Sequence, residues 1–556
     1  MYENWLANVD DEEVLNELYS MKDDEKKKDD CFGSFLSFGT SGLRGVIGAG
    51  TNNMNIYTVA RATKGLGEYL LNNYSNPSIA IGYDTRNKSD VFAKLAASIL
   101  AAKGIKVYIS NGIIPTPILA YSIRNIGTSA GIIITASHNP CIYNGYKVYD
   151  HNGCGITDDE AFLISSFIDK EDYFNTSISN FENGIKNGKI NYIDNKVIED
   201  YYETILKYSY NLECISKANL KVLYTPLHGT GMKHVECILK EIGIKNLSIV
   251  SSQEKPDKDF KTIFYPNPEF LNTFEEAIKY ARDINPDIII ATDPDADRLG
   301  LMVKNKDEYV KLNGNEVGYL FLNYILKNGN FKNGFTVKTI VTSTLIDKIA
   351  KKYGIDLFDV LIGFKYIGEK IDEKNSQFIF GFEEAIGYLI GDYIRDKDGI
   401  SAAMLISEMA SFYKLEGKTL FDVMNELYDE YGYYVCNTYN FEFKGSDGKR
   451  KMIDLMSQIR SKNLKNIHDK KVEVLNDYFL SKSINVKKGE EKSLNYPVSN
   501  ILEFILEGGS KIVIRPSGTE PKMKMYFIIT SENKKETIKL EQDLKEWFFG
   551  EIQISE

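Results

Sequence analysis

The chain has 556 residues, of which 43% are hydrophobic and 26% are charged. These values are ordinary for a globular protein, and they exclude a collagen-like chain, a wholly disordered chain and a disulfide-rich miniprotein. The formal net charge of −11 argues against nucleic acid as a partner, because binding to its phosphate backbone needs a basic surface. A chain of this length is expected to form about three to four domains.

Neither a membrane nor an exported location is expected. No apolar run approaches the roughly 20 residues that a membrane helix needs, so no membrane partner is predicted. The N-terminus carries acidic residues where a signal peptide carries basic ones, and a cytoplasmic location is the resulting expectation. The six cysteines form no C-x-x-C pair, which predicts neither a zinc site nor a disulfide framework.

The first predicted element is a solvated helix within residues 10–30, a segment that mixes both signs of charge. Strands then alternate with helices in three stretches. The first stretch has strands at 79–84, 106–110 and 131–135, and Val91, Leu95 and Ile99 form a helical stripe between two of them. The alternation returns at 221–292 and at 337–381. It predicts parallel, doubly wound sheets.

The last stretch, residues 433–556, differs because short strands precede one final helix. Gly508-Gly509 lies between two of these strands and is predicted to form a hairpin turn. The predicted fold class is therefore α/β, with three similar doubly wound α/β domains followed by a smaller C-terminal α+β domain. The predicted domains are residues 1–210, 211–312, 313–432 and 433–556.

Polar motifs follow the predicted strands, at the position where open α/β sheets bind ligands. In GIIITASHNP (131–140), Ser137 lies just past a buried strand. A hydroxyl held in a tight loop is a candidate nucleophile or phosphate carrier, and a serine that merely ends a strand is the alternative. His138 is not expected to act as its base, because neighbouring side chains on an extended segment diverge. G-x-S-x-G is absent, which disfavours a hydrolase.

The second motif is DPDADR, residues 293–298. Asp293, Asp295 and Asp297 are expected to converge on one side of an extended segment. Converging carboxylates repel unless a cation lies among them, and oxygen ligands suit Mg²⁺ or Mn²⁺. An EF-hand is excluded because its Gly and Glu positions are Arg298 and Lys304 here. Arg298 is placed to hold a phosphate beside the metal, and a solvated acidic loop is the alternative.

Two further motifs have the composition of anion and hydroxyl sites. In KIVIRPSGTEPK (511–522), Arg515, Ser517 and Thr519 with the flexible Gly518 form a candidate anion cradle; a plain hairpin turn is the alternative. In GFEEAIGY (381–388), Glu383 and Glu384 are placed to accept hydrogen bonds from sugar hydroxyls.

Other candidates lie nearby in the chain. Arg395 and Lys397 of IRDKDG could meet a phosphate. GTSGLRG (39–45) places Ser41 and Arg44 in a glycine-rich loop, and YNGYKVY (143–149) places Lys147 shortly after Ser137.

A competing motif, HGTGMKH (228–234), follows a strand and opens a helix, as half of a dinucleotide-binding fingerprint does. The third glycine position of that fingerprint is His234, so dinucleotide binding is not expected. The Walker pattern is absent as well.

Taken together, TASHNP, DPDADR, GFEEAIG and RPSGTEPK, with FGTSGLRG and NGYKVY, resemble the α-D-phosphohexomutase superfamily over roughly residues 38–530. FGTSGLRGVIGAGTNNMNIYTV and GFKYIGEKI are most similar to its phosphoglucomutase/phosphopentomutase branch. The resemblance implies four domains around a central cleft, each contributing one loop. It implies an isomerase that acts as an intramolecular phosphotransferase on sugar phosphates.

The resemblance also implies roles for individual residues. Ser137 would be a phosphoserine, and Mg²⁺ would be bound by that phosphoryl group with Asp293, Asp295 and Asp297. Lys147, as general acid/base partner, and Arg44 would flank the reacting phosphoryl group. The substrate-binding candidates are Ser41, His138, Arg298, Gly363, Lys365 and Tyr366 of GFKYIG, Glu383, Arg395, Lys397 and, for the non-reacting phosphate, Arg515, Ser517, Gly518 and Thr519.

The expected reaction interconverts glucose 1-phosphate and glucose 6-phosphate, with glucose 1,6-bisphosphate as intermediate and activator. Phosphomannomutase or phosphopentomutase activity of the same family, a serine-dependent phosphatase and a catalytically silent sugar-phosphate sensor are the alternatives. Ala385 replaces a serine found in many family members, and Tyr388 replaces the histidine of mannose-type members; both weaken the case for mannose. A monomer or weak dimer is expected.

Overall fold

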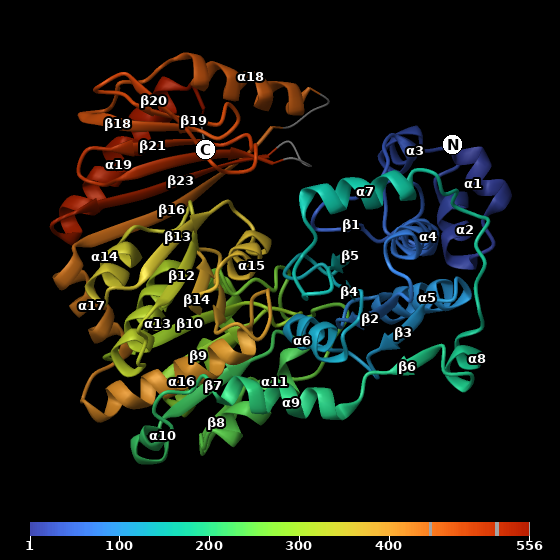
Figure 1. Cartoon of the computed structure of the whole chain (residues 1–556), viewed down its shortest axis with the longest axis horizontal. Helices are drawn as coiled ribbons and strands as arrows, with labels where there is room; N and C mark the ends of the chain where they lie inside the picture. The colour runs from blue at the N-terminus through green and yellow to red at the C-terminus, as the bar shows by residue number, and fades with distance from the viewer. Residues whose placement is uncertain (444–446, 518–521, 555–556) are drawn as a thin grey trace. The chain divides into compact units, whose positions relative to one another are not determined.

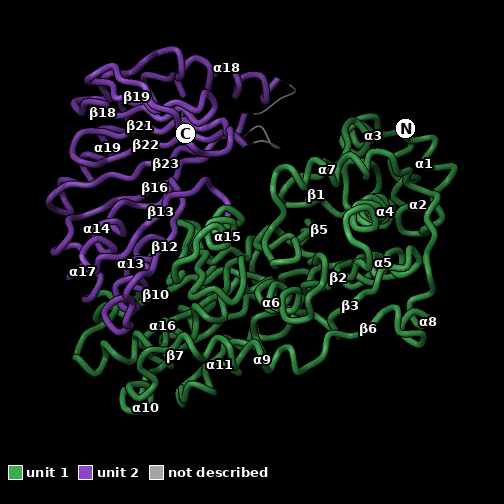
Figure 2. Tube along the Cα trace, viewed as in Figure 1, with its two compact units in different colours: residues 1–314, 364–421 green, residues 315–363, 422–556 purple. Residues whose placement is uncertain are grey.

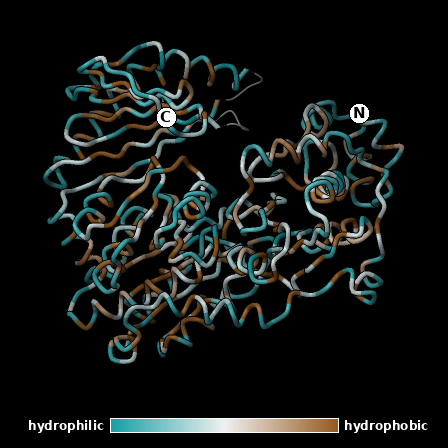
Figure 3. Tube along the Cα trace, in the orientation of Figure 1, coloured by the Kyte–Doolittle hydropathy of each residue, from teal (hydrophilic) through white to brown (hydrophobic). Residues whose placement is uncertain are grey.

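The computed structural model describes residues 1–443, 447–517 and 522–554, shown in Figure 1. The chain divides into two compact units, coloured separately in Figure 2. The first unit comprises Met1–Gly314 and Phe364–Phe421, and the second comprises Asn315–Gly363 and Asp422–Glu556. Hydrophobic stretches coincide with the strands and buried helices of each unit (Figure 3). Among the described residues, no helix is both long and apolar enough to cross a membrane.

The chain begins with three short helices instead of the single solvated helix predicted within residues 10–30. They are α1 (Tyr2–Asn8), α2 (Glu12–Ser20) and α3 (Glu25–Phe32). Asp11 and Asp24 cap the second and third helices through their side chains, as short acidic residues commonly do. The prediction was wrong because it weighed only the charges. Apolar side chains spaced along these helices form a core with Trp5, which is fully buried.

The first sheet has six strands in the order β1-β5-β4-β2-β3-β6. Strands β4, β2, β3 and β6 run parallel, whereas β5 and β1 are antiparallel to their neighbours. The strands are β1 (Leu43–Val46), β2 (Ser78–Tyr83), β3 (Lys106–Ile109), β4 (Ala130–Ile134), β5 (Tyr143–Tyr149) and β6 (Ile190–Tyr192). The associated helices are α4 (Ile56–Asn73), α5 (Ser89–Ala102), α6 (Thr116–Ile126), α7 (Asp158–Ile168), α8 (Phe181–Lys186) and α9 (Asn195–Leu206).

Helix α5 confirms the helical stripe predicted after the first strand. The stripe is displaced by one residue, however, because Val91 is 41% exposed whereas Phe92 is buried against the sheet.

The second sheet has five strands in the order β11-β10-β9-β7-β8, again with parallel strands flanked by an antiparallel pair. Its strands are β7 (Lys221–Thr225), β8 (Asn246–Ile249), β9 (Ile288–Thr292), β10 (Leu299–Asn305) and β11 (Glu308–Leu312). Its helical segments are α10 (Glu213–Ala218), α11 (Gly231–Glu241), the 3-10 helix η1 (Leu271–Phe274) and α12 (Glu275–Ile284). Strand β9 is buried throughout, as expected for a parallel strand covered on both faces.

The rest of the first unit adds a helix, a hairpin and a long buried helix. These are α15 (Phe364–Glu373), the antiparallel pair β14 (Gln377–Glu383) and β15 (Gly387–Ile390), and α16 (Gly399–Leu415). The side chain of Asp398 caps α16 by accepting from two backbone N–H groups. This helix is buried around most of its circumference and contacts α10, α11 and β15, so it forms part of the internal scaffold.

In the second unit, a parallel strand pair accompanies a large antiparallel sheet of order β16-β23-β22-β21-β18-β19-β20. The helices are α13 (Gly314–Asn328), α14 (Leu345–Lys352), α17 (Leu420–Tyr431), α18 (Gly448–Ser461) and α19 (Lys534–Glu551). The strands are β12 (Gly334–Thr339), β13 (Asp356–Val360), β16 (Tyr433–Glu442), β17 (Asn466–Ile467), β18 (Lys470–Asp477), β19 (Lys482–Asn485), β20 (Glu490–Ser493), β21 (Leu502–Leu506), β22 (Lys511–Pro516) and β23 (Lys522–Ser531).

The predicted fold class is confirmed: α/β elements are followed by a β-rich C-terminal region with one long final helix. Gly508 and Gly509 both have positive φ and join the antiparallel strands β21 and β22, which confirms the predicted hairpin turn. The sheets of the first unit are mixed, not wholly parallel. Strands β5 and β10 each pair antiparallel with the strand that precedes them in the chain, β4 and β9. This pairing positions residues of the candidate site.

Candidate active site

Ser137 lies in a tight turn after β4, which we call the serine turn (residues 135–140). Ser137 has φ 51°, a left-handed conformation that costs roughly 1–2 kcal/mol for a residue other than glycine. Its backbone N–H donates to Thr135 Oγ1 at 2.8 Å, and its hydroxyl donates to Asp293 Oδ2 at 2.8 Å. Ser137 is only 2% exposed. The turn therefore directs a buried hydroxyl at the first carboxylate of DPDADR.

The expectation that His138 lies away from Ser137 was wrong. His138 Nδ1 is 3.2 Å from Ser137 Oγ, because the left-handed backbone brings side chains together that an extended segment would separate. Burial, together with the positive charges of Arg298 and Arg44, lowers the pKa of His138 well below its usual value. His138 is accordingly a neutral hydrogen-bonding group at ordinary pH.

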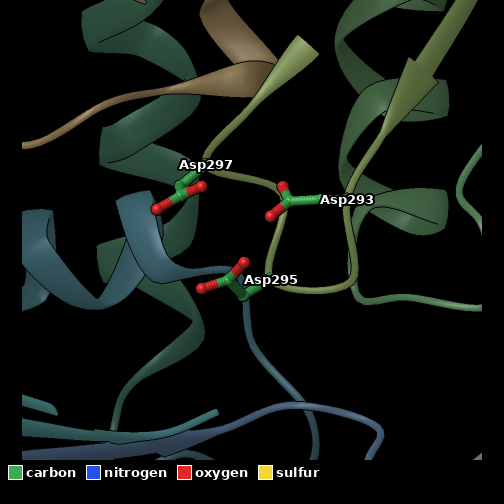
Figure 4. Close-up of side chains that lie close together, drawn as sticks. All are labelled: Asp293, Asp295 and Asp297. Atoms are coloured by element: carbon green, nitrogen blue, oxygen red, sulfur yellow. The ribbon is translucent and has the colours of Figure 1, made fainter. Parts of the chain in front are cut away.

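The three aspartates lie in a second turn, residues 293–298, which we call the acidic turn. It follows β9 and is not extended, as the sequence predicted; Ala296 has φ 54° and its N–H donates to the Asp293 carbonyl at 2.9 Å. Each aspartate contributes a carboxylate oxygen to a group whose members lie within 4.8 Å of one another. Figure 4 shows these carboxylates turned toward a shared space. The predicted convergence is thus present, and a turn produces it.

The charge balance of the acidic turn fits a bound divalent cation. The three side chains are at most 2% exposed. Burial and the repulsion of Asp295 and Asp297 raise the pKa of Asp293 well above its usual value. Asp295 Oδ1 and Asp297 Oδ1 are buried and have no hydrogen-bond partner among the described residues. Clustered carboxylate oxygens left unpaired in this way match the ligand set that Mg²⁺ prefers.

Two lysines provide the counter-charges of the acidic turn. Lys147 lies on β5, opposite Ile133 of β4, and its Nζ is 2.9 Å from Asp295 Oδ2. Burial disfavours ionisation of Asp295, but the charge of Lys147 and hydrogen bonds with Asp293, Lys147 and Thr116 together lower the pKa of this carboxyl. Lys397 Nζ is 3.2 Å from Asp297 Oδ2. The antiparallel return of β5 is therefore what brings Lys147 to the serine turn.

Arg298 connects the acidic turn to the GFEEAIGY segment. Its Nη1 donates to the Ala385 carbonyl at 3.2 Å, and its backbone N–H donates to Asp293 Oδ1 at 3.1 Å. Glu383, at the end of β14, is 8% exposed, and burial raises the pKa of its carboxyl despite the nearby Lys397. The structure thus brings Glu383, Arg298 and Lys397 together beside the aspartates.

Other predicted residues of the first unit are engaged differently. Arg395 is buried, and its Nε donates to Asp372 at 2.7 Å. Lys365 Nζ and the Tyr366 hydroxyl both donate to Asp158 Oδ2, at 3.0 and 2.9 Å. Neither arrangement includes the acidic turn.

Within GTSGLRG, the two predicted site residues Ser41 and Arg44 are exposed to solvent, whereas Leu43 is buried. Ser41 precedes β1, and Arg44 lies on β1 opposite Gly145 of β5. Tyr388, whose identity entered the sugar-specificity argument, is fully buried and stacks on Phe382 at a ring distance of 6.4 Å. The Tyr388 side chain therefore belongs to the hydrophobic interior. Of the two residues used to argue against mannose, only Ala385 lies at the site, where its carbonyl accepts from Arg298.

In the second unit, Arg515 and Ser517 line a cavity of about 310 Å³. The other lining residues are Asn440, Phe441, Glu442, Pro516, Lys522 and Lys524. The three cationic side chains among them, from Arg515, Lys522 and Lys524, give the cavity the charge that an anion requires. Gly518 and Thr519 lie outside the described residues, and Gly363 ends the first segment of this unit with φ 129°.

The HGTG motif supports the acidic turn. Leu227 and His228 both have positive φ, and a Cβ atom added to Gly229 would lie 2.4 Å from Pro294 Cα. The N–H and hydroxyl of Thr230 donate to the Pro294 carbonyl at 2.8 and 3.0 Å. We call residues 227–231 the glycine loop. Gly229 allows the backbone of Pro294 to approach closely. Dinucleotide-binding motifs use glycine for a similar close approach, which explains the resemblance of HGTG to them.

Sequence reasoning missed two further groups of residues. The N–H of Thr116, the first residue of α6, donates to the Asp295 carbonyl at 2.9 Å, and its hydroxyl donates to Asp295 Oδ2 at 3.0 Å. Asp84 and Arg86, after β2, form a buried ion pair at 3.2 Å. Thr116 carries no recognisable signal, whereas two charges directly after an apolar strand are a signal that could have been used.

Comparison with known proteins matches three successive regions of the chain to domains of one family. Residues 36–175 match phosphoglucomutase/phosphomannomutase alpha/beta/alpha domain I, residues 199–306 match domain II, and residues 313–431 match domain III. The phosphoglucomutase of Staphylococcus haemolyticus is 35% identical over the full length of both chains. The phosphoglucomutase of Staphylococcus epidermidis (strain ATCC 12228) is 33% identical, covering 96% of this chain and 97% of its own.

Solved structures show the same fold at lower identity. The Paramecium phosphoprotein pp63/parafusin, a phosphoglucomutase in its open form, has a TM-score of 0.70 and 19% identity over 92% of this chain and 95% of its own. A phosphoglucomutase/phosphomannomutase family protein of Burkholderia thailandensis has a TM-score of 0.69 and 16% identity over 93% of this chain and 98% of its own.

These matches define a mutase, an isomerase built from successive α/β domains. The chain belongs to the phosphoglucomutase/phosphomannomutase family. The resemblance seen in TASHNP, DPDADR and RPSGTEPK is thereby confirmed.

Proposed function

We propose that the chain interconverts glucose 1-phosphate and glucose 6-phosphate through a phosphoserine at Ser137 and a glucose 1,6-bisphosphate intermediate. The observation that carries this proposal is the contact between two turns: Ser137 Oγ lies 2.8 Å from Asp293 Oδ2, beside three buried carboxylates. A nucleophile next to a site for a divalent cation is the arrangement that phosphoryl transfer requires. Glucose is favoured because full-length relatives at about one-third identity are phosphoglucomutases.

Each half-reaction moves one phosphoryl group between Ser137 and a sugar hydroxyl. The bond from phosphorus to Ser137 Oγ breaks, a bond from phosphorus to the sugar oxygen forms, and the hydroxyl proton ends on Ser137 Oγ. We assign Lys147 as the group that carries this proton and Arg44 as a charge that flanks the phosphoryl group. The second half-reaction runs in reverse with the other phosphate of the bisphosphate, so the sugar leaves as its isomer.

Charge neutralisation is the main demand of this chemistry, because the transferred group is anionic throughout. Asp293, Asp295 and Asp297, with the phosphoryl group of Ser137, would hold Mg²⁺, which supplies positive charge to the phosphoryl oxygens. Arg298 and Lys397 lie beside the same carboxylates and add fixed positive charges. The burial of Ser137 supports transfer to a sugar over hydrolysis, because it limits the access of water.

Contacts to the sugar hydroxyls are assigned within the first unit, and a contact to a phosphate is assigned separately within the second unit. Glu383 would accept hydrogen bonds from sugar hydroxyls, with His138, Lys365 and Tyr366 as further contacts. The cationic cavity of the second unit supports Arg515 and Ser517 as the cradle of the non-reacting phosphate. One cradle must accept either end of the sugar, since each phosphate reacts in turn.

The test is a comparison of substrates together with a search for the phosphoserine. Peptide mass spectrometry of the purified protein should find phosphate within residues 131–147. Relative kcat/KM should then be measured for glucose 1-phosphate, mannose 1-phosphate and ribose 1-phosphate, with glucose 1,6-bisphosphate present. We expect glucose 1-phosphate to be the best hexose substrate. Equal rates with mannose 1-phosphate would contradict the glucose assignment and leave the phosphoserine mechanism intact.

A further inference from the structure

Arg86 is a fully buried arginine beneath the serine turn. It follows β2, and its side chain is 0% exposed. Its guanidinium donates to four backbone carbonyl oxygens of the segment that carries Ser137. Nη2 donates to the carbonyls of Ser137 and Asn139, both at 2.5 Å, and Nη1 donates to those of Pro140 and Tyr143 at 2.7 and 3.1 Å. One side chain thus binds three carbonyls of the serine turn and that of Tyr143, where β5 begins.

This arrangement needs a guanidinium. Four carbonyl oxygens that point toward one place repel each other, and buried carbonyls without donors are costly. A planar fork of five N–H groups around a delocalised charge can satisfy all four at fixed angles. A lysine ammonium offers three donors from a single atom and cannot span the same set. Arg86 therefore determines the path of the backbone through the serine turn as well as supplying charge.

Asp84 and Thr135 complete a closed chain of contacts around Ser137. Asp84 Oδ2 lies 3.2 Å from Arg86 Nε and accepts a hydrogen bond from Thr135 Oγ1 at 2.6 Å. Thr135 Oγ1 in turn accepts from the N–H of Ser137 at 2.8 Å. Ser137 is thus held at its carbonyl by Arg86 and at its N–H by Thr135. Both contacts favour the left-handed conformation that directs its hydroxyl at Asp293.

The same guanidinium also contacts a loop that follows a strand of the second sheet. The ring of Phe260, in the segment between β8 and η1, lies 4.9 Å from Arg86 Cζ. Burial lowers the pKa of Arg86, and the negative charges of Asp84 and then of Asp295 and Asp293 oppose that effect. Arg86 therefore holds the serine turn and is also close enough to the acidic turn to interact with its charges.

We propose that Arg86 is a positioning residue for phosphoryl transfer, acting with Asp84 and Thr135 to hold Ser137 where its hydroxyl meets the reacting phosphorus. The inference rests on the proposed function of Ser137. It predicts that loss of the guanidinium fork slows phosphoryl transfer while sugar-phosphate binding is preserved, because Arg86 donates to backbone carbonyls and to none of the side chains assigned to the sugar phosphate.

The first test compares Arg86→Lys with wild type and with Arg61→Lys. Arg61, on helix α4, is a matched control: its Nε also donates to a backbone carbonyl, that of Glu171 at 2.9 Å, and it pairs with Asp169, outside the site. The rate of Ser137 phosphorylation by labelled glucose 1,6-bisphosphate is measured by rapid quench, and the Kd for glucose 6-phosphate is measured by calorimetry. A nucleophile displaced by about 1 Å loses roughly 100-fold in rate, so we expect that loss in Arg86→Lys with Kd changed by less than about twofold.

A second pair of variants keeps the test decisive if Arg86→Lys unfolds. Thr135→Val removes the hydroxyl that links Asp84 to the N–H of Ser137 and preserves side-chain volume, whereas Thr135→Ser retains the hydroxyl. We expect slow phosphorylation in Thr135→Val and recovery in Thr135→Ser at similar Tm. Wild-type phosphorylation rates in Arg86→Lys or Thr135→Val would overturn the inference alone. Absence of phosphate from wild-type Ser137 would overturn both the inference and the proposed function.

Discussion

The substitution Gly229→Ala tests whether the glycine loop shapes the acidic turn. A Cβ at this position would lie 2.4 Å from Pro294 Cα and 2.6 Å from the Pro294 carbonyl oxygen. Both are backbone atoms, so no side-chain rotation can relieve the clash. Since carbon atoms pack at about 3.5 Å or more, the Pro294 backbone must move by about 1 Å. Pro294 lies between Asp293 and Asp295, and both carboxylates must move with it.

A displacement of this size is large for a magnesium site. Mg²⁺ demands nearly ideal octahedral geometry, and ligand distances in real sites vary by only about 0.2 Å. Changes in the groups that orient metal ligands typically reduce metal affinity by about 10- to 100-fold. We therefore expect the Kd of Gly229→Ala for Mg²⁺ to rise by that factor, which is about 1.4–2.7 kcal/mol of binding free energy.

Isothermal titration with Mg²⁺, and Mn²⁺ binding followed by electron paramagnetic resonance, measure this affinity without relying on turnover. Gly550→Ala is the control, because a Cβ at Gly550 meets no atom within 4 Å. An unchanged Kd in Gly229→Ala would refute the idea that the glycine loop holds the acidic turn. A wild-type protein that binds neither ion would instead refute the magnesium assignment.

Three other substitutions test separate parts of the proposed mechanism. Ser137→Ala should abolish phosphorylation of the protein and turnover, and full activity in this variant would exclude Ser137 as the carrier. Asp295→Asn should lower kcat by orders of magnitude in a folded protein, because it removes a ligand charge from the site that offsets the phosphoryl group; circular dichroism and steady-state kinetics check both points. Arg515→Ala should raise KM about tenfold or more, since a charge-assisted contact is worth roughly 1.5–3 kcal/mol, while mass spectrometry still detects phosphate on Ser137. An unchanged KM would mean that Arg515 does not bind the phosphate of the substrate.

Much of the fold was predictable because the alternation of strands and helices is a local signal. Buried strands such as β4 and β9 are short apolar runs with polar residues directly after them. The antiparallel strands β5 and β10 were not predicted. Each returns beside the preceding parallel strand after a tight turn, and nothing local distinguishes such a return from a loop. The position of Lys147 beside Asp295 follows from that return and could not be derived from its distance to Ser137 along the chain.

The candidate site was predictable in composition but not in shape. Asp293, Asp295 and Asp297 were correctly expected to converge, yet on an extended segment, whereas Ala296 in a left-handed conformation produces the convergence. The side chain of His138 was expected to diverge from that of Ser137 because an extended segment was assumed there too. The left-handed conformation of Ser137 instead brings the two side chains together. Neither Ser nor Ala favours positive φ, so no local propensity indicates these turns.

What imposes these conformations is contact with elements distant in sequence. The glycine loop and Thr116 hold the acidic turn through hydrogen bonds to the carbonyls of Pro294 and Asp295, and Arg86 gathers the carbonyls of the serine turn. A strained backbone persists only where its surroundings over-determine it, and here Arg86, Thr116 and the glycine loop, all outside the two motifs, add to the contacts that Thr135 and Asp293 make within them. The motifs therefore supply the reactive groups, whereas the positions of those groups depend on residues such as Arg86, Thr116 and Gly229. Substitutions at these residues should separate loss of geometry from loss of reactive groups.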